Sequence, residues 1–333
     1  MMMHKKKSFF SVLSLIAGAS AFAPISNGPS SSSLASSITT GSAADTNWFT
    51  ADTKKSDADV SILSTDQLKA QVLQLGAALD RGQAYNPTSG AYYSGSMIAA
   101  KKKIQELVSR ADPDVNIPKS LKDIEGEWEL VLTTVPHGIF RSSPFFLAIQ
   151  EAFEFAEDGD AFGEPKANLF FKLHELQTCS WGASKVGRVA QRIDPDTSYI
   201  YSEFDTSLFS LTVIPIVGWF KLLPTFGGCV ITASKCELKE GGKLEMTVDY
   251  TTSRPVPGLS GLGEWIWSIK VPVGFVWKLL PWNKGREANC SVEVKYFDDD
   301  FRIVQDLDGE MFVYTRPVVP RDFDIKEEMK TKL

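Results

Sequence analysis

The spacing of hydrophobic residues predicts a helical segment at the start of the folded part of the chain. In "STDQLKAQVLQLGAALDRG" apolar side chains recur three or four positions apart, at Leu68, Val72, Leu75 and Leu79. Ser64, Thr65 or Asp66 can cap the first turn of this helix, and the helix ends at Gly82. A second helix is predicted near residues 94–110, with its lysines, residues 101–103, on a solvated face.

Beyond residue 126 the pattern changes to short strands. In "EWELVLTT" the residues Trp128, Leu130 and Leu132 alternate with polar ones and share one face. Further strands are predicted near residues 167–175, 186–193, 198–205, 228–237, 243–252, 290–297, 300–305 and 310–316. Only residues 143–156 return to helical spacing. About nine strands without alternating helices predict a meandering antiparallel sheet that closes into a barrel or splits into a sandwich.

The first 44 residues have the pattern of a targeting sequence. A basic head, "MMMHKKK", precedes an apolar run too short for a membrane span, and small residues around Ala19 and Ala21 provide a cleavage site. Phe22 then follows the cut in "ASAFAP", and residues 22–44 are serine-rich without an acidic residue. This pattern resembles the bipartite plastid-targeting presequence of algae with secondary, red-type plastids. The alternative is a secreted protein with a serine-rich linker.

Composition and charge narrow the classes of partner. A hydrophobic share of 43% and a charged share of 23% are typical of a globular protein with a core. Without residues 1–44 the formal net charge changes from −6 to −9, because three lysines and no acidic residue are lost. An acidic surface is not attracted to phosphate backbones, so no nucleic-acid partner is expected. Any docking on a membrane then has to be apolar.

The sequence offers no catalytic constellation, and we expect a non-enzyme without a cofactor. His4 is in the signal, while His137 and His174 have the surroundings of a turn and a strand. A nucleophile elbow, a phosphate-binding glycine loop and a helical pair of histidines are all missing from the sequence. Cys179, Cys229, Cys236 and Cys290 form no C-x-x-C pair, so we expect buried free thiols.

The acidic run Asp298–Asp300 could form a calcium site, because calcium takes several oxygen ligands. The run lacks the spacing of an EF-hand loop. We therefore expect no metal there, but a solvated turn between two strands that supplies an ionic partner for Arg302.

Two sequence features suggest how the sheet is closed. Gly126 and Trp128 form a Gly-x-Trp at the start of the first strand, and Arg316 follows the last strand. The ligand-binding barrels of the lipocalin superfamily are similar: a first-strand tryptophan plugs the closed end, and an arginine stacks over its indole. Such a cation–π contact is worth about 0.5–2 kcal/mol. We predict that Trp128 and Arg316 form this pair.

The wider pattern resembles the plastid lipid-associated proteins, also called fibrillins or plastoglobulins, over about residues 64–317. Four segments match in order: "LKAQVLQLGAALDRG", "IEGEWELVLTT", "SPFFLAIQEAF" and "YFDDDFRIVQDLDGEMFVYTR". The motif residues singled out are Gly126, Ser143, Pro144, Phe145, Phe146, Asp298 and Arg302. The resemblance implies a plastid protein that binds lipid or an apolar small molecule and has no established catalytic residues.

Two similar apolar stretches remain, "IPIVGWFKLLPTF" from Ile214 and "VPVGFVWKLLPW" from Val271. Both are too short to span a bilayer, but Trp and Phe favour a membrane interface, and lysines beside them can reach headgroups. We predict lipid contact for Trp219, Phe220, Trp265, Trp267, Trp277 and Trp282, with Trp219, Phe220 and Trp277 partly exposed in the lipid-free protein. The alternative is that both stretches are covering helices of the core.

The predicted organisation has six parts. Residues 1–21 are a signal peptide, residues 22–44 a transit peptide and residues 45–63 a linker. Residues 64–118 are an N-terminal helical segment that caps an antiparallel lipocalin-like β-barrel over residues 119–320, and residues 321–333 are a tail. The fold class is therefore α+β, mainly β with N-terminal helices.

The expected function is the non-catalytic binding of a carotenoid, quinone or fatty acid in the plastid, with docking on thylakoid or plastoglobule lipid. One alternative is a structural protein that coats lipid bodies or joins a photosynthetic complex, its barrel filled by side chains. Another is a barrel enzyme acting on a lipid or pigment. A small barrel can be solid or hold one ligand, and the sequence leaves both open.

Overall fold

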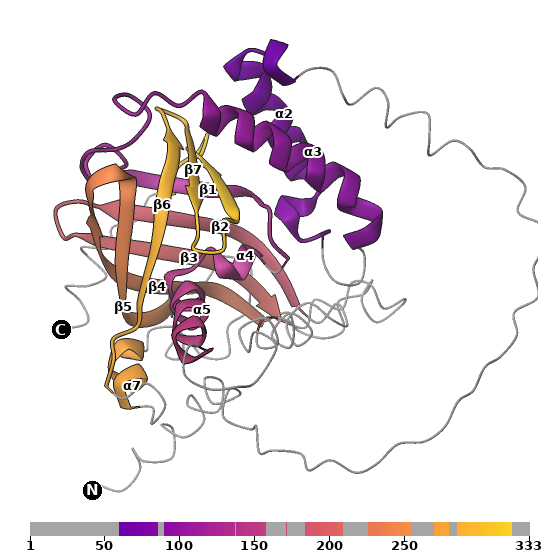
Figure 1. Cartoon of the computed structure of the whole chain (residues 1–333). Helices are drawn as coiled ribbons and strands as arrows, with labels where there is room; N and C mark the ends of the chain where they lie inside the picture. Colours follow the sequence, from indigo (N-terminus) through magenta and orange to yellow (C-terminus); the bar gives the residue numbers. More distant parts are fainter. Residues whose placement is uncertain are drawn as a thin grey trace, which may run out of the picture. The chain divides into compact units, whose positions relative to one another are not determined.

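The computed structural model describes residues 60–85, 90–136, 138–157, 171, 184–208, 226–254, 270–279 and 285–321 (Figure 1). Its α-helices are α2 (Thr65–Ala78), α3 (Gly90–Ser109), α4 (Gly138–Arg141), α5 (Pro144–Glu157) and α7 (Val273–Leu279). Its strands are β1 (Gly126–Thr133), β2 (Ser184–Asp194), β3 (Tyr199–Leu208), β4 (Phe226–Leu238), β5 (Lys243–Arg254), β6 (Asn289–Phe297), β7 (Phe301–Gln305) and β8 (Met311–Thr315). The predicted signal and transit peptides, residues 45–59 of the linker and residues 322–333 of the tail lie outside the described residues.

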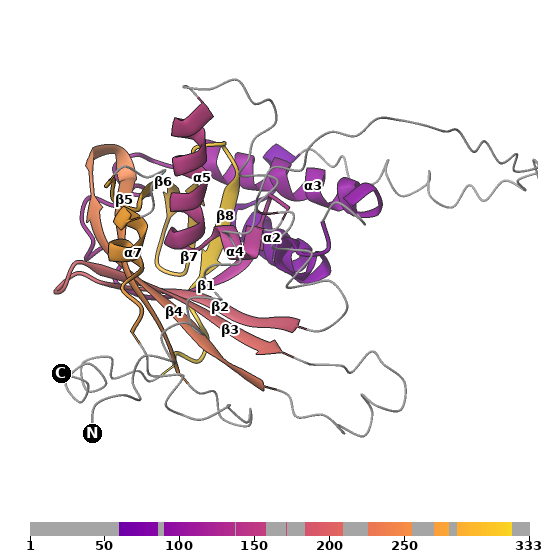
Figure 2. The ribbon, with the colours of Figure 1, turned by 90° about the horizontal axis from the view of Figure 1, so that it is seen from below.

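The described strands form one eight-stranded antiparallel sheet that closes on itself. Each strand pairs with the next along the chain, and β1 also pairs with β8, where Glu129 lies opposite Thr315. Strands β2 to β5, of 10 to 13 residues, are longer than β7 and β8, of 5 residues each, and extend beyond them in Figure 2. The predicted meandering antiparallel sheet is confirmed. The strand predicted at residues 167–175 lies outside the described residues except for Phe171, which is helical.

The N-terminal helices pack against the outside of the closed sheet. The predicted cap of α2 is Ser64, whose hydroxyl accepts a hydrogen bond from the Gln67 backbone N–H at 3.2 Å. Leu68 and Val72 of α2 are fully buried in one core with Ile303 and Val313 of the sheet. Helix α2 also contacts α3 and β1, so the two helices cover the β1 side of the ring (Figure 1).

A second core fills the inside of the ring. It contains inward-facing residues of the strands together with Leu147, Ala148 and Ile149 of α5, and α5 packs against β4, β5 and β6 (Figure 2). The predicted helical spacing over residues 143–156 is therefore confirmed, and its apolar face covers the interior. Among the described helices, none combines the length and the apolar character needed to cross a membrane.

Candidate functional site

Trp128 and Arg316, predicted to form a pair, lie together at one end of the ring. The guanidinium carbon of Arg316 is 3.8 Å from the centre of the Trp128 ring. Trp128 is fully buried, and its indole N–H donates to the carbonyl oxygen of Ile124 at 2.9 Å. Arg316 Nη1 donates to the carbonyl oxygen of Glu125 at 2.5 Å. These contacts tie the end of β8 to the chain that leads into β1.

Gly126 makes room for this pair. Its φ of +91° lies in the region that favours glycine, and a Cβ added there would lie 3.0 Å from Arg316 Nη1. Any side chain at this position would therefore meet both backbone strain and the guanidinium. Glycine is therefore required at position 126 of the Gly-x-Trp motif because of its positive φ and because Arg316 lies so close.

Arg302 of β7 is the second guanidinium near Trp128, and it is completely buried. Its guanidinium carbon lies 4.9 Å from the Trp128 ring centre and 4.6 Å from that of Tyr314. Nη2 donates to Gln191 Oε1 at 2.6 Å, but Nε and Nη1 have no hydrogen-bond partner among the described residues. Burial lowers the pKa of Arg302 to about 10, so the side chain is still charged at neutral pH.

The expected pairing of Arg302 with the acidic turn is wrong. Asp298 instead forms an ion pair of 2.5 Å with Lys69 of α2 and accepts a hydrogen bond from the Tyr296 hydroxyl at 2.5 Å. The cause is the alternation of β7: its neighbour Ile303 faces the helices, which sends Arg302 to the inside of the ring. The predicted turn itself is confirmed, since residues 298–300 connect β6 and β7.

A small cavity adjoins Arg302 inside the ring. Its volume is about 10 Å³, which is enough for one water molecule. Polar side chains line one part of it, Ser142, Gln191, Arg302 and Tyr314, and apolar side chains line the rest, Leu147, Ile200, Leu244, Met246, Val292, Val304 and Phe312. In the described structure the interior is therefore almost filled by side chains.

Gln191 and Tyr314 are site residues that the sequence analysis missed. Gln191 connects Arg302 to the chain before α5, because its Nε2 donates to the Ser142 carbonyl oxygen at 3.0 Å. Burial raises the pKa of Tyr314 to about 12, so its hydroxyl stays neutral. A signal for Gln191 was present: it stands between Val189 and Ile193 in the strand alternation, where an apolar residue is expected.

The Ser143–Phe146 motif forms the start of α5. The Ser143 carbonyl oxygen accepts the Leu147 N–H at 3.0 Å, and the thiol of Cys290 in β6 donates to the Pro144 carbonyl oxygen at 3.3 Å. Phe146 packs against Phe140, with ring centres 5.8 Å apart. The motif therefore seats α5 on the sheet, and the structure does not place it in contact with Asp298.

Of the six aromatic residues predicted to contact lipid, the structure describes only Trp277. Trp219, Phe220, Trp265, Trp267 and Trp282 lie outside the described residues. The expectation that Trp277 is partly exposed is wrong: it is 9% exposed and packs edge-on against Phe145 at 6.3 Å. The exposed apolar side chains of α7 are instead Phe275, at 63%, and Leu279, at 65%.

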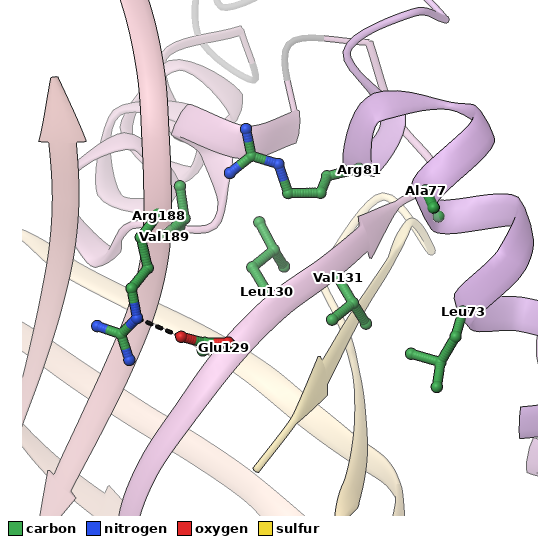
Figure 3. A pocket seen from close by; sticks show the side chains of 9 residues that line it. Leu73, Ala77, Arg81, Glu129, Leu130, Val131, Arg188 and Val189 are labelled. Atoms are coloured by element: carbon green, nitrogen blue, oxygen red, sulfur yellow. Dashed lines mark hydrogen bonds and ion pairs between the residues drawn. The ribbon is translucent and has the colours of Figure 1, made fainter. Parts of the chain in front are cut away.

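A larger hollow lies outside the ring, between α2 and strands β1 and β2 (Figure 3). We call it the outer groove; its volume is about 470 Å³ and its lining residues are Leu73, Gly76, Ala77, Arg81, Glu129, Leu130, Val131, Arg188 and Val189. Arg188 pairs with Glu129, as the dashed line in Figure 3 shows, and with Glu127. Arg81 donates to the carbonyl oxygens of Val186 and Gly187. The charged side chains of the outer groove are therefore already paired or hydrogen-bonded within the protein. The remaining side chains that line it are mainly apolar.

Among the described residues, no three His, Cys, Asp or Glu side chains gather as a metal site would require. Cys229, Cys236 and Cys290 are buried free thiols, as predicted, and burial raises the pKa of each. His137, His174 and Cys179 lie outside the described residues. Comparison of the chain with protein-family models, curated proteins and solved structures gave no match.

Proposed function

We propose that this chain is a non-catalytic binding protein with a lipocalin-like barrel, of the plastid lipid-associated kind. In this proposal it holds an apolar small molecule, a carotenoid, quinone or fatty acid, and docks on thylakoid or plastoglobule lipid. The observation that carries the proposal is the closed sheet in which Trp128 is buried under Arg316. Closed eight-stranded sheets of this size hold one small ligand or are filled by side chains.

The wall of the interior supports an apolar ligand. The side chains that line it come from six strands and α5, and most of them are aliphatic or aromatic. Part of the interior is covered by Leu147 of α5 rather than by the sheet itself. A ligand larger than a water molecule requires this helix, or side chains on it, to move.

The exposed side of α7 supports docking on lipid. Phe275 and Leu279 present apolar surface to solvent, and Lys278 between them forms an ion pair with Glu287 at 2.8 Å. Phenylalanine and leucine at an exposed helix face gain free energy when they enter the boundary between headgroups and acyl chains. Because the chain is acidic without its first 44 residues, this attachment is apolar and weakly dependent on salt.

One observation favours a second candidate function. A cavity of about 10 Å³ fits a barrel packed solid, whose role is then structural, on a lipid body or in a photosynthetic complex. In that case the interior residues stabilise the fold and bind nothing.

Mass analysis of an organic extract of the mature protein, purified from its own source, separates the two. An apolar molecule present in about equal amount to the protein supports the binding function. An empty extract, together with no binding of added carotenoid, quinone or fatty acid, leaves the structural role. A fluorescent protein fused behind residues 1–44 tests the plastid part of the proposal, which a secreted fusion would contradict.

A further inference from the structure

Arg302 is a buried charge that lacks a counter-ion in the part of the chain that the structure describes. The other two arginines that are buried there each pair with a carboxylate: Arg141 with Asp308 and Arg254 with Glu203, both at 3.0 Å. Arg302 has no such ion pair among the described residues, and two of its nitrogen atoms have no acceptor there. A buried charge costs free energy unless it is paired, so this position calls for an anion.

The neighbours of Arg302 do not supply one. Gln191 accepts one hydrogen bond, and the rings of Trp128 and Tyr314 contribute only cation–π attraction. Arg316, on the same indole, adds a second positive charge and lowers the pKa of Arg302 further. Two guanidinium groups on one tryptophan make this end of the interior electropositive.

The cavity next to Arg302 indicates the chemical character of the rest of the molecule that carries the anion. Most of the cavity's lining is apolar, with Leu244 and Met246 from β5, Val292 from β6 and Leu147 from α5 among these residues. A single buried guanidinium matches a single negative charge, and charge-assisted hydrogen bonds from it suit a carboxylate. The matching molecule therefore has one carboxylate and an aliphatic body.

We propose that Arg302 binds the carboxylate of a long-chain aliphatic acid inside the closed sheet, and that Leu147 of α5 moves aside to admit the acid. The inference rests on the proposed binding function and specifies its ligand class. Leu147 is the side chain that has to give way, because it comes from the helix that covers the interior and lines the cavity beside Arg302.

The test compares a fatty acid with its own ester. cis-Parinaric acid, a fluorescent fatty acid, and its methyl ester are titrated against the mature protein and against Arg302→Met. The acid is expected to bind about tenfold or more tightly than the ester, because the ester offers no charge to Arg302. Arg302→Met is expected to weaken binding of the acid by a similar factor and to leave binding of the ester unchanged.

Two further variants locate the site. Leu147→Ala enlarges the cavity and is expected to bind the acid at least as tightly as the unmodified protein. Ala77→Trp fills the outer groove from the exposed face of α2 and is expected to change nothing. Thermal melting of each variant shows that it is folded, and Arg302→Gln, which is polar but uncharged, serves if Arg302→Met does not fold.

The possible results distinguish a failure of the Arg302 inference from a failure of the proposed binding function. Equal binding of acid and ester, unaffected by Arg302→Met, overturns the role of Arg302 and leaves a binding protein for apolar molecules. Loss of binding in Ala77→Trp moves the ligand to the outer groove and also overturns it. If neither probe binds even to Leu147→Ala, the inference fails, and the binding function is then decided by the organic extract and by added carotenoid and quinone.

Discussion

The guanidinium carbon of Arg316 lies 3.8 Å from the centre of the Trp128 ring, although Trp128 belongs to the first strand of the closed sheet and Arg316 follows the last. Their contact joins the start of the first strand to the residue that follows the last. Because the indole is fully buried beneath the guanidinium, each residue depends on the other for its packing.

We predict that Trp128→Ala lowers the free energy of unfolding by about 3–5 kcal/mol, as truncation of a buried aromatic side chain does. Arg316→Ala should cost about 0.5–2 kcal/mol for the lost cation–π contact. In urea unfolding the double variant should lose less than the sum of the single variants, because the contact is lost only once. Strict additivity would show that the two side chains do not interact. Arg316→Met, which keeps the apolar stem, serves as the control for lost packing.

Arg302→Met should stabilise the ligand-free protein. It removes a buried charge with two unsatisfied nitrogen atoms, whose cost is about 1–3 kcal/mol. The matched change Arg141→Met should destabilise by about 3–5 kcal/mol, because it leaves the buried Asp306 without its partner. Urea unfolding of both variants in protein freed of bound lipid measures the contrast. Equal destabilisation by both would mean that Arg302 is a structural residue already satisfied by its rings.

Gly82→Ala should destabilise the contact between the helical segment and the sheet. Gly82 has a φ of +100°, and a Cβ there would lie 2.4 Å from the carbonyl oxygen of Thr133. Strain and overpacking together should cost at least about 2 kcal/mol. Gly95→Ala in α3 is the control: with nothing within 4 Å of the added Cβ, it should stabilise by about 0.5–1 kcal/mol. Thermal melting measures both variants. A shift of the melting temperature in the same direction for both would contradict this account.

Asp298→Asn should make the free energy of unfolding less dependent on pH in the acidic range. Asp298 is partly desolvated, but its hydrogen bonds with Lys69 and Tyr296 lower its pKa in the folded state. A lowered pKa stabilises the fold above the unfolded-state value, about 3.9, and this contribution is lost as the pH falls through the folded-state value. The unmodified protein should therefore exceed the variant in stability at pH 7 and approach it as the pH falls through the lowered folded-state pKa of Asp298. Urea unfolding as a function of pH measures this, and a difference that does not change with pH would contradict it.

The exposed and buried sides of α7 should respond differently to polar substitution. Phe275→Ser combined with Leu279→Ser should release the protein from vesicles of plastid lipids with little change in melting temperature, because both side chains are exposed. Trp277→Ser should lower the melting temperature before any lipid is added, because Trp277 is buried against Phe145. Vesicle flotation at several salt concentrations, beside thermal melting, tests both. Release by salt alone would argue against apolar docking.

Much of the fold follows from local patterns. The helix at Ser64 has a cap and a regular apolar spacing, and most of the strands alternate between turn residues, so both kinds of element were predictable. The Trp128–Arg316 pair was predictable from its resemblance to a known arrangement. The helix and the strands were predictable from residues that lie close together in the sequence. The Trp128–Arg316 pair was predictable from two residues near the ends of the first and last strands.

The side on which a residue lies was harder to predict where both sides of an element are buried. In β7, Ile303 faces the helices and Val304 the interior, so both faces of the strand are apolar and its sequence has no polar–apolar alternation that would reveal an inward Arg302. In α7, the pairs Val273 with Trp277 and Phe275 with Leu279 have the same spacing of four. Only tertiary packing, which the sequence does not display, decides that the first pair is buried.

The pairing of β1 with β8 has a consequence for how the chain acquires its structure. Arg316 and Glu125, which it contacts, are 191 residues apart along the chain. A chain that emerges from a ribosome or an import pore with its N-terminus first exposes one edge of β1 until β8 arrives. Unpaired edges of this kind invite aggregation, and contacts between distant residues form slowly. Ring closure is therefore expected to be the slow step of folding, and the period before it the one in which the protein most needs chaperones.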